Sequence, residues 1–133
     1  MLLKNYFVYN GLLFGVTTNK MKSTFGTEIP TYNLVPNSKC LVGSGTAPAS
    51  VDDFKLENER TDATTTFTVN ISDNGTKVVN IISNLSSHEM LISEVGIACY
   101  LNENNCFLMT RTVLEEPVVL EVGDVVVIET QFA

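Results

Sequence analysis

The chain has 133 residues, which is enough for one domain or for one domain with an arm. Apolar residues make up 44% of it and charged residues 17%, a composition that excludes a wholly disordered chain. Eight Lys and Arg residues against fifteen Asp and Glu residues give a net charge of −7. This balance argues against nucleic acid as the main partner, because nucleic-acid binding depends on cationic contacts to phosphates. No run of 18 apolar residues occurs, so we expect no membrane-spanning helix and no membrane partner.

The N-terminal part of the chain differs from the rest in charge and in pattern. Residues 1–50 carry four lysines and one glutamate, a net charge of +3, whereas residues 51–133 carry four basic and fourteen acidic residues, a net charge of −10. This asymmetry fits an arm and a body with different partners, and it equally fits ordinary scatter. Residues 1–39 show no sustained periodicity, and Pro30 and Pro36 exclude a long helix.

The same N-terminal segment holds more apolar and aromatic residues than a free tail needs. We therefore expect residues 1–39 to form an extended arm that docks on its own body or on a neighbouring subunit, ahead of a β-sandwich domain over residues 40–133. The residues expected at this assembly interface are Tyr6, Phe7, Tyr9, Leu12, Phe14, Phe25 and Tyr32.

The first strong strand pattern of the body lies at residues 66–72 (TFTVNIS). Residues 52–60 before it are the one candidate helical turn, although residues 54–56 fit an extended segment equally well. Apolar and polar residues alternate at residues 66–72, which is typical of a half-buried strand. Asp-Asn-Gly at residues 73–75 tolerates the positive φ angles of a tight turn. Because a second strand pattern follows at residues 76–85, the segment predicts a β-hairpin.

Further strand patterns follow to the C-terminus. Residues 106–113 form a strand that Glu-Glu-Pro at 115–117 is expected to end, before a short strand at 118–121. Residues 125–132 (VVVIETQF) are at first apolar on both faces, which predicts a central strand. Short strands with turn signals about every 8–12 residues predict an all-β fold, an antiparallel β-sandwich of jelly-roll-like or immunoglobulin-like type with an extended N-terminal arm. Residues 90–101, which precede residues 106–132 in the chain, show the alternation of a strand. One face of this strand is expected to hold Leu91, Val95, Ile97, Cys99 and Leu101.

No segment of the sequence predicts a catalytic, cofactor or metal site. The glycine stretch at residues 42–48 lacks the Gly-Lys-Ser/Thr of a phosphate-binding loop, and its glycines fit a tight loop after a strand. Asp52, Asp53 and Asp73 carry the oxygen ligands that calcium prefers, but no spacing supports such a site. Solvated faces explain the acidic pairs better than the facing carboxylates of a glycosidase do. These pairs are Asp52/Asp53, Glu57/Glu59 and Glu115/Glu116.

Isolated polar and sulfur-bearing residues are expected to have structural roles. His88 lies in a polar turn, where exposure is expected. Arg111 lies within an apolar stretch, where we expect a structural pair across the sheet with an acidic residue such as Glu94 or Glu129. The three cysteines are odd in number and lack C-x-x-C spacing, so buried small side chains are expected, with one disulfide as the alternative. They are Cys40, Cys99 and Cys106.

Three segments of the body carry a resemblance to structural proteins of tailed bacteriophages. Their order and spacing agree with those proteins across residues 41–132. The segments are LVGSGTAP at 41–48 followed by Asp52, Asp53, Leu56 and Glu57; ISEVGI at 92–97; and FLMTR at 107–111 followed by PVVLEVGD at 117–124. The resemblance implies a β-sandwich virion protein of head-fibre, capsid-decoration or tail-attachment type, with no catalytic residues.

Three functions follow as hypotheses. The first is a structural, oligomeric virion subunit that docks on capsid or tail proteins and on copies of itself through its arm and sheet edges. The second is a receptor- or glycan-binding module of a phage fibre, with a host-surface glycan as partner and the polar loop at residues 102–105 as the contact. The third is a small enzyme such as a cell-wall hydrolase, which only scattered carboxylates support. We favour the virion subunit, located in the particle and without enzymatic activity or cofactor.

Overall fold

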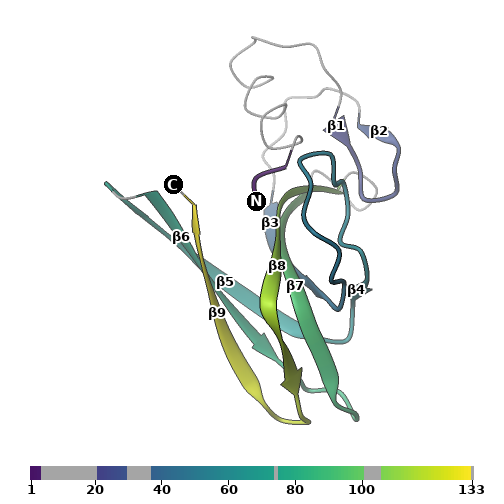
Figure 1. Ribbon diagram of the computed structural model, residues 1–133, viewed down its shortest axis with the longest axis vertical. Helices are drawn as coiled ribbons and strands as arrows, with labels where there is room; N and C mark the ends of the chain where they lie inside the picture. The colour runs from purple at the N-terminus through teal and green to yellow at the C-terminus, as the bar shows by residue number, and fades with distance from the viewer. Residues whose placement is uncertain (4–20, 30–36, 74, 101–105, 133) are drawn as a thin grey trace.

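The computed structural model describes residues 1–3, 21–29, 37–73, 75–100 and 106–132. This part of the chain is all-β, with two antiparallel sheets in a sandwich-like arrangement and a separate two-stranded hairpin (Figure 1). The expected fold class is therefore confirmed. Its strands are β1 (Met21–Lys22), β2 (Glu28–Ile29), β3 (Asn37–Gly43), β4 (Glu59–Arg60), β5 (Thr64–Ser72), β6 (Gly75–Ser83), β7 (Met90–Tyr100), β8 (Cys106–Leu120) and β9 (Val125–Phe132).

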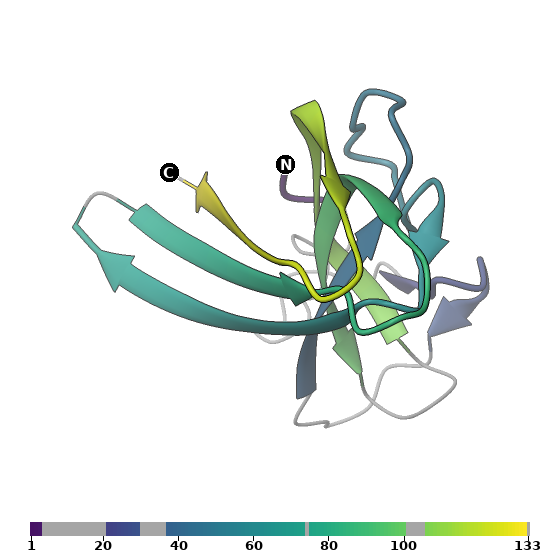
Figure 2. The same ribbon diagram turned by 90° about the horizontal axis from the view of Figure 1, so that it is seen from below.

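The two sheets have the strand orders β4-β3-β7-β8 and β5-β6-β9. They meet where β8 turns into β9, and the β5–β6 hairpin extends away from the four-stranded sheet at its other end (Figures 1 and 2). The β1–β2 hairpin lies beside the four-stranded sheet (Figure 1). Among the described residues, no helix has the length and apolar character needed to cross a membrane.

The predicted hairpin at residues 66–85 is present as β5 and β6. Ser72 pairs with Gly75, whose φ of 116° is the positive value that a tight turn requires and that glycine adopts without strain. Along β5 the side chains of residues 64–68 alternate between exposed and half-buried positions, as the sequence pattern predicts. By contrast, the candidate helical turn at 52–60 does not form, because Glu59 and Arg60 pair with β3 as β4.

β7 departs from the predicted alternation because its pairing with β8 shifts register between Ile92 and Glu94. Such a bulge moves the following side chains to the other face. Met90 and Ile92 therefore share the inner core with Val95, whereas Leu91 is 39% exposed on the opposite face. The expectation that Leu91 and Val95 lie on one face is wrong.

β8 and β9 correct two further predictions. β8 continues through Pro117 because it is an edge strand, and the register shift beside β7 leaves room for a residue without an N–H group. β9 is also an edge strand, not a central one. Val125 and Val127 are 60% and 56% exposed on its outer face, so its apolar run does not reflect burial on both faces.

Apolar clusters cover both faces of the four-stranded sheet. On the inner face Phe67, Val126 and Ile128 of the three-stranded sheet pack against the cluster Cys40, Val42, Ile82, Met90, Ile92, Val95 and Leu120. The outer face is covered by Leu3 from the N-terminal segment and by Leu56 from the loop between β3 and β4. The cluster there consists of Leu3, Leu41, Leu56, Ala98, Cys106 and Leu108.

A buried asparagine joins the two sheets where they meet. Asn84 follows β6, and its Nδ2 donates hydrogen bonds to the carbonyls of His88 and Leu120 at 2.9 and 2.8 Å. Its backbone N–H donates to the carbonyl of Asp124, and its carbonyl accepts from the N–H of Gly123. Gly123, with φ of 87°, makes the predicted turn between β8 and β9. Asn84 therefore joins the connection between β6 and β7 to the turn between β8 and β9.

Candidate functional site

The most highly organised polar site lies on the outer face of the four-stranded sheet and begins with a cross-strand ion pair. Arg111 of β8 donates from Nε to Oε2 of Glu94 of β7 at 2.8 Å. The Glu94 side chain is 0% exposed and the Arg111 side chain is 3% exposed. The predicted pairing of Arg111 with Glu94 is confirmed, whereas Glu129, the other candidate, pairs with Lys77 on the surface.

The buried carboxylate of Glu94 holds the loop between β3 and β4, residues 44–58, which we call the strap. The N–H groups of Gly45 and Asn58 donate to its Oε1 at 3.1 and 2.8 Å. The N–H of Glu57 donates to Oε2 at 3.1 Å. With the bond from Arg111, four donors converge on one carboxylate, so both ends of the strap are fixed to the sheet by a single side chain.

The guanidinium of Arg111 holds the middle of the strap. Its Nη1 lies 2.9 Å from Oδ2 of Asp53 and 3.4 Å from the carbonyl of Pro48, and its Nη2 donates to the carbonyl of Ala47 at 3.0 Å. The Glu57 carboxylate lies 4.0 Å from Nη2. We call Asp53, Glu57, Glu94 and Arg111 the clamp.

Glycines give the strap room to approach the clamp. A Cβ at Gly45 would lie 2.7 Å from Glu94 Oε1 and would also overlap the Glu57 side chain. A Cβ at Gly43 would lie 2.5 Å from the same oxygen, and one at Gly96 would lie 2.6 Å from the carbonyl of Thr110. The glycines of the strap region are therefore explained by close packing and not by phosphate binding.

The Glu94–Arg111 pair is charged in spite of its burial. Burial alone would raise the pKa of Glu94, but hydrogen bonds from the N–H of Asn58, from Arg111 and from the N–H groups of Glu57 and Gly45 outweigh burial and lower that pKa. Burial likewise opposes the charge on Arg111, and its bonds to Glu94 and Asp53 raise its pKa above the ordinary value. A sealed carboxylate that accepts four hydrogen bonds fixes a loop, and it has no open face for a substrate.

Two of the acidic candidates, Asp53 and Glu57, meet at the clamp through Arg111, and the others do not join them. Glu57 is turned into the strap, where its carboxylate accepts from the N–H groups of Thr46 and Ala47. Asp53 belongs to the clamp, while Asp73 lies in the β5–β6 turn, on the far side of the molecule from β4 (Figure 1). In the described ranges, no group of three or more His, Cys, Asp or Glu side chains is placed to hold a metal ion.

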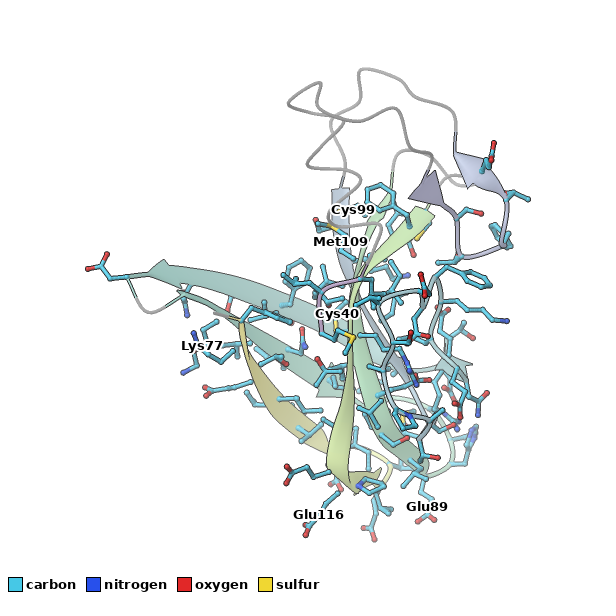
Figure 3. The ribbon with its side chains drawn as sticks, turned by 45° about the horizontal axis from the view of Figure 1, so that its top comes forward. Cys40, Lys77, Glu89, Cys99, Met109 and Glu116 are labelled. Carbon is cyan, nitrogen blue, oxygen red and sulfur yellow. The ribbon has the colours of Figure 1, made fainter. Side chains whose placement is uncertain are left out.

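The remaining polar candidates lie on the surface. Glu115 and Glu116 are exposed on the edge strand β8, and Figure 3 shows Glu116 at the end of the sandwich. His88 is exposed, as predicted, and its Nε2 lies 3.2 Å from Oδ2 of Asp62. Asp62 also accepts hydrogen bonds from Arg60, which lower its pKa.

The cysteines are free and buried, which confirms the prediction of buried small side chains. Figure 3 shows Cys40 well separated from Cys99, whose Sγ lies 2.8 Å from Sδ of Met109. Burial raises the pKa of the Cys40 thiol to about 12. Burial also raises the pKa of Cys99 and Cys106, so all three thiols are protonated at neutral pH.

The predicted assembly residues lie mostly outside the described residues. This applies to Tyr6, Phe7, Tyr9, Leu12, Phe14 and Tyr32. Phe25 is described: it lies in the turn between β1 and β2 and is 72% exposed.

A groove beside Phe25 has no counterpart in the sequence predictions. It is a cavity of about 430 Å³ with a floor that includes Leu41, Leu56 and Cys106. Phe25 of the β1–β2 turn, Tyr100 at the end of β7, and the strap with Glu59 form its walls. Sequence reasoning missed it because five separate segments build it, and none of them carries a ligand-binding motif.

Comparison of the chain with protein-family models, with curated proteins and with solved structures finds no match.

Proposed function

We propose that this protein is a non-enzymatic structural subunit of a bacteriophage particle, which self-associates and docks on capsid or tail proteins through its arm and sheet edges. The observation that carries the proposal is the open edge of β9. This strand pairs with β6 and with no other described strand, and its outer face carries exposed Val125 and Val127 beside Ile81. A long apolar edge strand is a template for pairing with another chain.

The edge strand of the other sheet, β8, differs from β9 because another part of the chain covers it. Along β8, the N–H of Leu3 donates to the carbonyl of Met109, and the N–H of Arg111 donates to the carbonyl of Met1. Leu2 pairs with Thr110 between these bonds. The first three residues thus cover residues 109–111 of β8, whereas no described segment covers β9.

Two β9 strands can pair with each other without electrostatic conflict. Antiparallel pairing centred on Val127 places Val125 of one copy opposite Glu129 of the second, so no like charges lie directly opposite. The two three-stranded sheets would then form one continuous sheet of six strands. Exposed valines from both copies would adjoin on its outer face.

The bacteriophage assignment rests on the three resembling segments, and their places in the fold favour a structural role. Gly45, Glu57, Glu94 and Arg111, which all belong to these segments, meet at the clamp. A subunit that must withstand assembly needs a firmly held fold, and the clamp provides it.

Self-association is tested by light scattering coupled to size-exclusion chromatography of the full chain. We expect a defined oligomer, and Val127→Lys should yield the monomer because a charged lysine blocks edge pairing. Val51→Lys is the matched control, since Val51 is 50% exposed in the strap and lies outside β9. A monomeric wild-type chain, or an oligomer that Val127→Lys leaves intact, refutes edge pairing.

The location is tested by quantitative mass spectrometry of purified particles from a phage that encodes this chain. We expect several copies per particle. Absence of the chain from particles overturns the virion proposal, whatever its oligomeric state. The alternative contact at residues 102–105 for a glycan-binding module lies outside the described residues, but the groove beside Phe25 offers another place for a glycan.

A further inference from the structure

The groove walls combine an exposed aromatic ring, carried on a hydrogen-bonded turn, with hydrogen-bonding groups. Phe25 lies in a turn that three hydrogen bonds around Ser23 hold closed: Ser23 N–H to Thr27, Gly26 N–H to Ser23, and Phe25 N–H to Ser23 Oγ. The N–H of Thr24 donates to the carbonyl of Cys106 at 3.0 Å and anchors this turn to β8. An aromatic ring that is 72% exposed on a fixed turn is accessible to a ligand, and the backbone that carries it has little freedom left to lose on binding.

The opposite wall supplies polar contacts. Lys55, Asn58 and Glu59 are exposed around the cavity and offer an ammonium, an amide and a carboxylate. Burial, together with Cys106 and Glu59, raises the pKa of Tyr100, whose hydroxyl is hydrogen-bonded with Cys106 of the groove floor. The floor of the groove, which includes buried Leu41, is apolar.

The size of the groove matches a small ligand. Its volume of about 430 Å³ lies within the ~300–1,000 Å³ that is typical of small-molecule sites. The strap wall is fixed from behind by the clamp, because Glu94 binds the N–H groups of Glu57 and Asn58. Both walls are therefore preformed.

From these features we infer that the groove binds a neutral saccharide of one or two rings. A pyranose has an apolar C–H face, which suits the exposed ring of Phe25, and a periphery of hydroxyl groups, which suits the amide, carboxylate and ammonium opposite. Glu57 and Glu59 exceed the single Lys55 in charge, and residues 51–133 carry a net charge of −10, so uronic and sialic acids are disfavoured. The inference does not depend on assembly into a particle.

The test uses the full chain on an array of neutral hexoses, N-acetylhexosamines, uronic acids and sialic acids. The strongest ligand is then titrated by NMR against four variants. We expect Phe25→Ala to weaken binding about ten-fold, equivalent to ~1.4 kcal/mol, which corresponds to loss of roughly 50–60 Å² of buried apolar contact. Leu85→Ala is its matched control, because Leu85 is also 72% exposed and is not part of the groove wall.

A second pair of variants tests the polar wall. Glu59→Gln should weaken binding several-fold, whereas Glu89→Gln should not, because Glu89 precedes β7 and the length of that strand separates it from Tyr100. All four substitutions are at exposed positions, and circular dichroism checks their folds. No array binding, binding of anionic saccharides alone, or equal effects of Phe25→Ala and Leu85→Ala would each overturn the inference. A peptide library bound in a Phe25-dependent manner, with no saccharide bound, would assign the groove to a peptide instead.

Discussion

Replacing Glu94 with glutamine tests the clamp, because it keeps the shape of the side chain and removes its charge. Glu94 accepts two hydrogen bonds on each oxygen: from Gly45 and Asn58 on Oε1, and from Glu57 and Arg111 on Oε2. Whichever way the amide is turned, its NH₂ group faces two donors. Two of the four donors then lose their acceptor, and in either orientation Arg111 loses the negative charge of its buried partner.

The expected destabilisation is large. Removing one partner of a buried ion pair costs about 3–5 kcal/mol, and the whole free energy of unfolding of a domain is about 5–15 kcal/mol. Glu129→Gln is the matched control, because Glu129 pairs with Lys77 at 3.0 Å with both side chains about half exposed. An exposed pair contributes only about 0–1 kcal/mol. The two glutamine variants should therefore differ by at least about 2 kcal/mol.

Urea unfolding followed by circular dichroism measures this difference through the transition midpoint, with the slope m as a check for two-state behaviour. Hydrogen exchange adds a local readout: the amides of Gly45, Glu57 and Asn58 should lose protection in Glu94→Gln. The double variant Glu94→Gln/Arg111→Met should be less destabilised than the sum of the single variants, since neither member of the buried Glu94–Arg111 pair is then left charged without the other. A Glu94→Gln midpoint as close to wild type as that of Glu129→Gln would refute the clamp as a main source of stability.

Three further predictions follow from the same contacts. Gly45→Ala should destabilise the protein by about 1–3 kcal/mol in urea melts, because its Cβ would overlap Glu94. Gly123→Ala should destabilise it by about 1–2 kcal/mol because of the φ of 87° alone. A Gly45→Ala variant as stable as wild type would contradict the packing argument. The pKa of Glu94 is lower in the folded chain than in the unfolded chain. The charged Glu94 therefore stabilises the fold fully above the unfolded pKa, and this stabilisation is lost as pH falls through the folded pKa. Below about pH 4.5 the wild type should lose stability faster than Glu94→Gln, and parallel losses in the two proteins would contradict this. The native thiols should react slowly with a thiol reagent at pH 8, because burial holds the Cys40 pKa at about 12, and all three should react in urea; a fast-reacting thiol in the native chain would show that it is accessible.

Local signals predicted part of this fold. The β5–β6 hairpin was predictable because its turn and both alternating strands lie within about twenty consecutive residues, and Gly75 has the positive φ that the turn motif implies. The position of Leu91 was not predictable, because it depends on a register shift that only the pairing with β8 creates. The edge position of β9 depends on sheet order, and an apolar run such as VVVI does not distinguish a central strand from an edge with one exposed face.

The same distinction applies to the clamp. A charged residue within an apolar strand signals a partner, and this was enough to predict the pair between Arg111 and Glu94. The strap contacts were not predictable, because Glu94 binds backbone N–H groups of residues 36–49 positions away, and any residue type presents the same N–H group. Only Gly45 carries a sequence signal of this contact, and a glycine in a loop has several explanations.

The clamp and the groove are mechanically linked, which connects stability to the proposed ligand. Glu94 accepts hydrogen bonds from the N–H groups of Glu57 and Asn58, and both residues are part of the groove wall. Neutralising Glu94 should therefore loosen one groove wall while the wall formed by the Phe25 turn stays in place, since that turn is anchored to the carbonyl of Cys106. A ligand that binds a loosened wall must also order that wall, so a saccharide that binds the groove should bind the Glu94→Gln variant more weakly than wild type. The bound saccharide should raise the midpoint of the urea transition of this variant.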